Sequence, residues 1–114
     1  MKNLRNSVRL IGNLGADPKI TKFGNQNQIA SFNLATDDSY KDKDGKRVEQ
    51  TQWHRIIVKG GLAFVAEKYL KKGMEIEVEG RLLTRSYETK DGEKRYITEI
   101  EANDLVMLGK KQSA

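Results

Sequence analysis

The sequence predicts an all-β domain with one short helix. Most of its 114 residues lie in segments where apolar and polar side chains alternate with a period of two, the pattern of half-buried strands. These segments are rich in valine, isoleucine, threonine and aromatic residues, which favour strands. One stretch repeats instead with the period of a helix. A chain of this length forms one domain with a real core, which we expect to span residues 1–108.

Five strands follow from the alternation. They are predicted at residues 7–13, 28–36, 51–59, 75–87 and 94–108. In the second strand, the period of two places Ala30, Phe32 and Leu34 on one face, opposite Ser31 and Asn33. In the fourth strand, Ile76, Val78 and Leu82 are predicted to point inward for the same reason.

The helical stretch covers residues 61–73. Its apolar side chains fall on one stripe, composed of Leu62, Val65, Ala66, Tyr69 and Leu70. We expect this stripe to face the core. Phe64 lies off the stripe, so we expect it to be partly exposed or in a subunit contact.

The order of elements favours a barrel. Strands in a small all-β chain need closure to hide their edges. Five strands with a helix between the third and the fourth form the OB-fold arrangement, which commonly binds oligonucleotides or oligosaccharides. The main alternative, an SH3-like barrel, has no natural place for this helix.

Composition favours an anionic partner. The chain has 21 Lys and Arg residues against 16 Asp and Glu residues, and its pI is near 9.5. This balance points to nucleic acid first and to an acidic membrane surface second. The absence of cysteine excludes disulfides and thiolate chemistry. Since no apolar run has the length of a signal peptide or a membrane span, we expect a cytoplasmic protein with no membrane partner.

Catalytic motifs are missing from the sequence. The only histidine, His54, lies within a predicted strand, and it cannot anchor a transition-metal site without a second histidine or a cysteine. We therefore expect a packed or interface histidine, no metal, no cofactor and no enzyme activity. Gly12 and Gly15 match the G-x-x-G loop of KH domains, but the flanking helices are absent. We expect these glycines to let the chain turn sharply out of the first strand.

Aromatic rings and cations share a face on two strands. The third strand places Trp53, Arg55 and Lys59 together, and the fourth places Arg85 beside Tyr87. Unpaired bases stack on such rings for about 1–3 kcal/mol per base, while neighbouring phosphates bind the cations. Duplex DNA hides its base faces. The pattern therefore favours single-stranded nucleic acid.

Two hairpins repeat this composition. "YKDKDGKR" and "TRSYETKDGEKRYITE" each place a tyrosine before a Lys-Asp-Gly turn and basic residues after it. The first contains Tyr40, Lys43, Lys46 and Arg47, and the second contains Tyr87, Lys90, Lys94 and Arg95. In an OB barrel such loops extend from the binding region, so we expect both to contact nucleic acid. Tyr96 follows the second turn, and we expect it to pack rather than stack.

Ordered motifs along the chain are similar to a known family. "VRLIGNLGADP", "FNLAT", "EQTQWHRIIV", "AEKYLKKG", "VEGRLLTRSY" and "RYITEI" resemble, in this order, the DNA-binding domain of bacterial single-stranded DNA-binding protein (SSB). The resemblance spans about residues 6–108. It implies an OB-fold that assembles as a homotetramer. It also implies sequence-tolerant binding and protection of single-stranded DNA in replication, recombination and repair, without catalysis.

The resemblance also implies roles for individual residues. The family's three stacking tryptophans match Trp53, Tyr40 and Tyr87, so stacking is expected with less area at the two tyrosines. A fourth stacking position, usually phenylalanine, falls on Lys59, which exchanges stacking for attraction to phosphate.

Three further positions complete the comparison with the family pattern. Arg55 and Arg85 match basic residues on the family's DNA path, and His54 matches a histidine associated with subunit contacts. The family normally continues into a long tail with an acidic tip that recruits other proteins. Here residues 109–114 are a short basic remnant that we expect to be disordered, so the chain is either shortened or naturally tail-less. We do not expect tail-mediated protein partners.

Two alternatives remain open at this point. One is a tail-less primosomal assembly factor with the same fold. The other is an OB-type protein-interaction module whose aromatic face docks a partner chain. Trp53 is the only tryptophan, so its fluorescence can separate the DNA-binding hypothesis from the interaction module.

Overall fold

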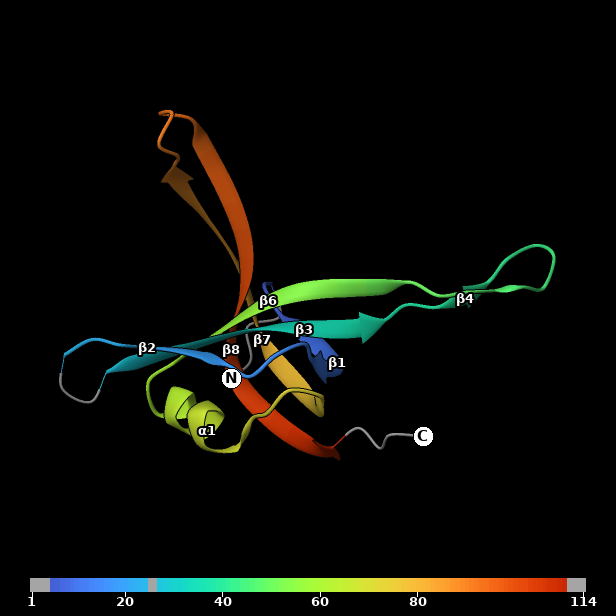
Figure 1. Cartoon of the computed structure of the whole chain (residues 1–114), viewed down its shortest axis with the longest axis horizontal. Helices are drawn as coiled ribbons and strands as arrows, with labels where there is room; N and C mark the ends of the chain where they lie inside the picture. The colour runs from blue at the N-terminus through green and yellow to red at the C-terminus, as the bar shows by residue number, and fades with distance from the viewer. Residues whose placement is uncertain (1–4, 25–26, 111–114) are drawn as a thin grey trace.

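The computed structural model describes residues 5–24 and 27–110, and most of them lie in strands (Figure 1). The elements are β1 (Val8–Leu14), β2 (Lys19–Lys22), β3 (Gln28–Asp37), β4 (Tyr40–Lys41), β5 (Arg47–Val48), β6 (Thr51–Lys59), α1 (Gly61–Tyr69), β7 (Met74–Glu88) and β8 (Lys94–Lys110). The five predicted strands and the helix are confirmed within a few residues at each end. The short strands β2, β4 and β5 were not predicted.

The five long strands close on themselves. The main sheet has the order β1-β7-β8-β6-β3-β2, and β1 also pairs with β3, which joins the ends of the ring. The pairs within this sheet are antiparallel except for β6 and β8, which run parallel from Ile56↔Ile100 to Val58↔Ala102. This is the OB-fold arrangement that the sequence predicts.

Two hairpins extend beyond the barrel (Figure 1). The short β4–β5 sheet continues outward from the β3–β6 pair. The last pair of β1 with β7 is Val8↔Gly80, and the pairing of β6 with β8 begins at Ile100. Residues 82–98 therefore form a two-stranded ribbon, which we call the β7–β8 arm.

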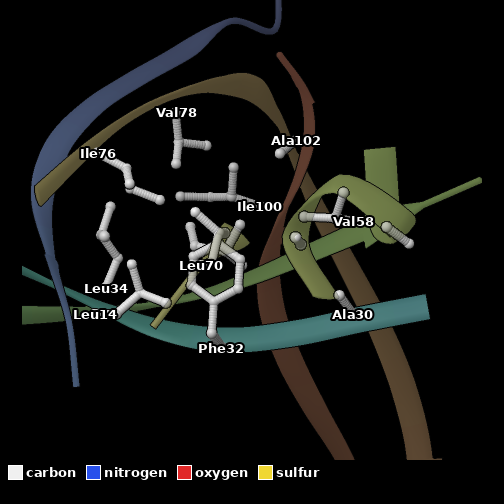
Figure 2. Packing of buried hydrophobic residues seen from close by; sticks show 13 residues of the cluster. Leu14, Ala30, Phe32, Leu34, Val58, Leu70, Ile76, Val78, Ile100 and Ala102 are labelled. Atoms are coloured by element: carbon white, nitrogen blue, oxygen red, sulfur yellow. The ribbon is translucent and has the colours of Figure 1, made fainter. Parts of the chain in front are cut away.

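The core lies inside the ring and is capped by α1 (Figure 2). Phe32 and Leu34, which share one face of β3, are buried, and Ile76 and Val78 point inward as predicted. The prediction for Leu82 was wrong, because 47% of this residue is exposed. Leu82 lies beyond the end of the β1–β7 pairing, so β1 no longer flanks it there.

The helix packs against β3 and β6 with small side chains. Ala63, Ala66 and the C-cap residue Leu70 are buried, whereas Tyr69 is 48% exposed. The predicted stripe was therefore wrong at Tyr69. The helix ends there and Leu70 adopts an extended backbone, which turns Leu70 into the core in its place. Phe64 is 42% exposed, as expected.

The glycines of β1 serve close packing. A Cβ atom at Gly12 would lie 2.3 Å from the carbonyl oxygen of Ala35. Gly12 lies inside β1, so the expectation that it marks a sharp turn was wrong. It allows β1 to approach β3 where the ring closes.

The far end of β8 passes the domain boundary expected at residue 108. The strand continues to Lys110. The rest of the expected basic remnant, residues 111–114, lies outside the described residues.

Candidate nucleic-acid interface

Trp53 lies on the outer face of β6 and is 60% exposed. It pairs with Ala35 of β3, whose small side chain leaves the ring uncovered on that side. A Cβ atom at Gly15 would lie 2.6 Å from Cζ3 and 2.9 Å from Cη2 of the indole. The ring therefore rests against the backbone of Gly15, which also lies in the bend where the chain leaves β1, as expected.

A groove continues from this face of β6 toward the β7–β8 arm. It has a volume of about 320 Å³ and is lined by Thr21, Ile29, Ser31, Arg55, Ile57, Lys59, Leu83, Arg85 and Glu99. We call it the β6 groove. Its lining is mainly apolar, from Ile29, Ile57 and Leu83, and it contains three of the predicted cations. An apolar surface with cations beside it suits bases and phosphates together.

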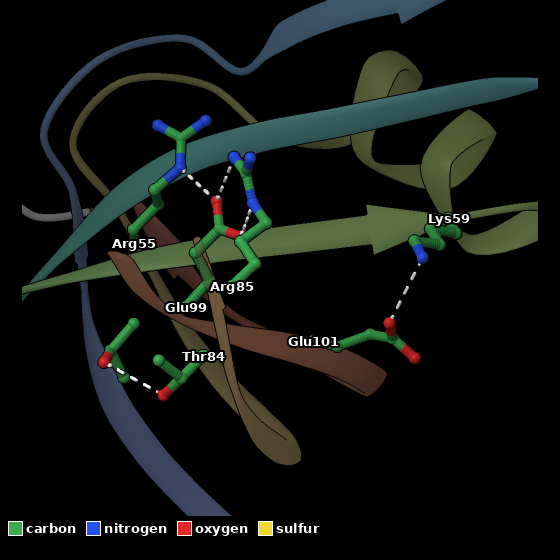
Figure 3. A network of polar contacts seen from close by, with 7 residues as sticks. Arg55, Lys59, Thr84, Arg85, Glu99 and Glu101 are labelled. Atoms are coloured by element: carbon green, nitrogen blue, oxygen red, sulfur yellow. Dashed lines mark hydrogen bonds and ion pairs between the residues drawn. The ribbon is translucent and has the colours of Figure 1, made fainter. Parts of the chain in front are cut away.

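Two of these cations share one carboxylate (Figure 3). The Nε–H of Arg55 donates to Oε2 of Glu99 at 2.6 Å. Arg85 donates from Nε to Oε1 at 2.7 Å and from Nη2 to Oε2 at 3.3 Å. The Glu99 side chain is only 1% exposed, while the two arginines are 42% and 56% exposed.

The charges in this cluster stabilise one another. Hydrogen bonds from Arg85, and then from Arg55, lower the pKa of Glu99 below its ordinary value, although burial opposes them. The hydrogen bond with Glu99 raises the pKa of Arg85. The cluster therefore stays fully ionised at neutral pH and carries one net positive charge.

Lys59 belongs to a second, looser cluster on the same face. Its Nζ lies 3.4 Å from Oε2 of Glu101, and Nη2 of Arg81 lies 3.4 Å from Oε1 (Figure 3 shows the Lys59 contact). The side chain of Lys59 is 58% exposed. Exposed pairs of this kind contribute little energy, so Lys59 can exchange Glu101 for another anion at small cost.

The two predicted stacking tyrosines are exposed, at 53% for Tyr40 and 48% for Tyr87. Tyr40 lies in β4 and Tyr87 near the outer end of β7. The expectation that Tyr96 packs was wrong, because it is 68% exposed and lies beneath Nζ of Lys94, 5.8 Å from the ring centroid. The arm is a two-stranded ribbon, so it offers no third layer against which this ring could be buried.

The basic side chains predicted at the hairpins are all exposed. They are Lys43, Lys46 and Arg47 near the β4–β5 turn, and Lys90, Lys94 and Arg95 near the tip of the arm. The two hairpins leave the barrel in different directions, so their tips do not meet (Figure 1). Trp53 lies in the part of β6 nearer the β4–β5 hairpin, whereas the β6 groove lies between the base of the arm, β6 and the β2–β3 pair.

His54 faces away from Trp53 and is half-buried. Its Nε2 lies 3.1 Å from Oγ1 of Thr36. A shallow pocket beside it is lined in part by Leu82 and Ile100. The role of His54 at a subunit interface stays a prediction.

Sequence reasoning missed Glu99. Its register could have revealed it, because the Lys-Asp-Gly turn pairs Leu83 with Glu99 and Arg85 with Ile97. Glu99 is thus the diagonal neighbour of Arg85 on one face of the β7–β8 pair. Among the residues 5–24 and 27–110, no group of three or more His, Cys, Asp or Glu side chains is placed to hold a metal ion. Within the same ranges, no helix is long and apolar enough to cross a membrane.

Comparisons with known proteins agree with this geometry. The sequence profile of the single-strand binding protein family matches residues 5–108. Single-stranded DNA-binding protein 1 of Xylella fastidiosa is 49% identical over 108 residues, which cover 94% of this chain and 79% of that protein. The protein of the same name from Chlorobaculum tepidum is 46% identical over 109 residues, covering 95% of this chain and 67% of that protein.

A solved structure matches the fold. The chain in the structure titled "Plasmodium falciparum SSB complex with ssDNA" superposes with a TM-score of 0.83 at 34% identity. The match covers 95% of this chain and 97% of that one. The match therefore extends over nearly the whole chain rather than a fragment of the sheet.

Proposed function

Because this chain belongs to the single-strand binding protein family, we propose that it binds and protects single-stranded DNA during replication, recombination and repair. The observation that best supports this function is the placement of exposed Trp53 beside the β6 groove, with Arg55, Lys59 and Arg85 along it. The proposed role is binding without catalysis or a cofactor, in the cytoplasm on the nucleoid, with no membrane partner.

The proposed contacts divide between bases and phosphates. Bases stack on Trp53, Tyr40 and Tyr87, each of which is about half exposed or more. Phosphates bind Arg55, Lys59 and Arg85 along the groove, and the hairpin cations Lys43, Lys46, Arg47, Lys90, Lys94 and Arg95 around it. Every base has a π-face, so recognition of this kind is tolerant of sequence.

We also propose a homotetramer. In the described chain, β1 pairs with β3 only at Asn13 and Leu14, so most of one edge of β1 is open to another strand. On the outer face of this sheet, Ile11 and Val106 are 52% and 46% exposed, and each pairs with Glu77. An open strand edge beside exposed apolar side chains suits contact with a second copy. His54 is proposed to lie at a subunit contact.

The fluorescence of Trp53 tests directly whether bases stack on its ring. We expect strong quenching by oligo-dT, a much weaker response to duplex DNA of the same length, and an affinity that falls steeply with salt as counterions are released. No quenching by single strands at low salt would contradict base stacking on Trp53 and favour the protein-interaction module.

A further inference from the structure

Glu99 joins two separate parts of the molecule. Arg55 belongs to β6 in the barrel wall, Arg85 belongs to the β7–β8 arm, and Glu99 lies in β8 between them. Its carboxylate accepts three N–H hydrogen bonds from these two side chains. Because it is 1% exposed, it cannot exchange its partners for water in the folded protein.

A buried acid is unexpected in a surface that is proposed to bind phosphates. On charge alone, Glu99 cancels one of the two guanidinium charges and should weaken the attraction for DNA. The geometry indicates a compensating effect. Arg55 uses only its Nε–H, so both of its terminal amino groups are without a partner among the described residues and point away from Glu99 (Figure 3). Arg85 retains its Nη1 group in the same way.

The carboxylate thus fixes the direction of the remaining donors. An exposed arginine samples many rotamers, and that freedom is lost when it binds a phosphate. A guanidinium that is already held through Nε loses less rotamer freedom when it binds a phosphate. Its planar fork, formed by the N–H groups, also stays in one orientation. The Arg55 and Arg85 forks are also held at a fixed separation, because both are bonded to the same carboxylate.

We propose that Glu99 is a positioning residue that holds Arg55 and Arg85 ready to bind two phosphates of a single strand, and that it fixes the arm to the barrel for this purpose. This inference rests on the proposed function. Glu99 itself does not contact the DNA. Its effect on affinity is opposite in sign to the effect of its charge.

The chain contains a charge-matched control. Glu101 lies two residues further along the same face of β8 and also joins two cations, Lys59 and Arg81. Its contacts are longer, 3.4 Å to each cation, and its side chain is 24% exposed. Glu99→Gln and Glu101→Gln therefore make the same change in net charge, but only the first disrupts a buried, closely bonded cluster.

The experiment compares the binding of fluorescently labelled oligo-dT by anisotropy over a range of salt concentrations. For Glu99→Gln we expect about tenfold weaker binding than wild type. We also expect a salt slope shallower by about 0.7, the contribution of one phosphate on a single strand. For Glu101→Gln we expect unchanged or up to about threefold tighter binding, with an equal or steeper slope.

Two outcomes would overturn the inference. If both variants bind more tightly than wild type, Glu99 only neutralises charge. If Glu99→Gln binds more weakly but keeps the wild-type slope, the weaker binding reflects general destabilisation rather than poorer binding of phosphates. Wild-type protein that fails to bind oligo-dT would instead remove the proposed function itself, and the inference with it.

If Glu99→Gln does not fold, a second variant tests the same positioning role. Arg85→Lys keeps the charge but replaces the planar fork with a single ammonium group. We expect about tenfold weaker binding here too, because an ammonium cannot bond Glu99 and a phosphate in the fixed directions of the fork. Wild-type affinity at every salt concentration would refute the positioning role.

Discussion

The position of the Trp53 ring depends on a residue without a side chain. The indole lies against Gly15, and a Cβ atom there would stand 2.6 Å from the ring. If a Cβ atom were added at Gly15, the ring could move aside without disturbing the core, because the ring is exposed. Gly15 therefore sets the orientation of the ring that is proposed to stack on a base.

We expect Gly15→Ala to fold normally but to weaken oligo-dT binding by about 1 kcal/mol, less than the roughly 1–3 kcal/mol expected for Trp53→Ala. Titration of both variants with oligo-dT checks this, alongside thermal unfolding. Gly61→Ala is the control, because a Cβ atom at Gly61 meets nothing within 4 Å. Equal affinity for Gly15→Ala and wild type would show that the ring orientation is unimportant.

Glu99 makes the stability of the protein depend on pH in the acidic range. Its pKa is lowered in the folded state, so it binds a proton less readily there than in the unfolded chain. Its ion pairs therefore contribute fully above the ordinary value of 4.5, and the contribution is lost as the pH falls through the lowered folded value. We expect Glu99→Gln to be less stable than wild type at pH 7, with a difference that shrinks toward pH 3.

Urea unfolding followed by Trp53 fluorescence at several pH values measures this difference. The wild type is the reference at each pH. Both proteins share the other carboxylates, so their effects cancel in the difference between the two unfolding free energies. A gap between the two proteins that stays constant from neutral to acid pH would contradict the lowered pKa of Glu99.

At this scale, sequence alternation predicted well which way side chains face. Trp53 and Arg55 lie outside the barrel and Ile56 inside it, as a period of two requires. What it could not reveal were relations across strands. Glu99 resembles any acid on a solvated strand until the register beside Arg85 is known, and Gly15 shows its role only when the ring lies above it.

The β7–β8 arm is the element that most distinguishes this barrel from a closed, compact one. Thr84 and Thr98 approach within 3.3 Å across its base, and the Glu99 cluster lies just below. Beyond Arg85, the strands of the ribbon pair only with each other in the described part of the chain. Changes at its tip should therefore affect binding without affecting the stability of the barrel.

We expect the triple variant Lys90→Gln, Lys94→Gln, Arg95→Gln to keep the wild-type unfolding free energy within about 0.5 kcal/mol. We expect its salt slope for oligo-dT to be shallower by about 0.7 for each phosphate that the arm no longer binds. The matched variant Lys43→Gln, Lys46→Gln, Arg47→Gln tests the other hairpin. If either triple variant keeps the wild-type slope, that hairpin lies off the DNA path.

Elements were predictable where they were long. The alternation in the five long strands was strong enough to locate them, whereas β2 has a single half-buried residue among four and no pattern of its own. It exists because it pairs with β3, and such pairing is not visible in a four-residue window. Tyr96 was mispredicted for a related reason, since the sequence does not show where a hairpin leaves the barrel.

The whole barrel presents two different outer surfaces. One contains Trp53 and the β6 groove. Another, on β1, β7 and β8, contains Ile11 and Val106 on either side of Glu77. Separate surfaces allow the proposed assembly and the proposed DNA path to exist together in one molecule.

We expect light scattering to give the mass of a tetramer for the wild type and a smaller species for Ile11→Glu, which places a charge in the proposed contact. Phe23→Glu is the matched control, since Phe23 is 50% exposed but lies beyond β2. A monomeric wild type would refute the tetramer, and an equal effect of both variants would show that the contact lies elsewhere.

The barrel as a whole followed from the order of elements, because few arrangements hide the edges of five strands with one helix. Its assembly did not follow, since Ile11 reads as an ordinary outward residue of an alternating strand. An outward side chain meets either solvent or another subunit, and alternation within one chain does not distinguish them.

The parallel pairing of β6 with β8 has a consequence for the order of folding. Ile56 pairs with Ile100, so the ring closes through contacts between residues far apart in the chain. Such non-local contacts form late and slow the folding of barrels. A nascent chain must therefore release β8 from the ribosome before Glu99 can reach Arg55. The protein should acquire its affinity for DNA only after β8 has been synthesised and has paired with β6.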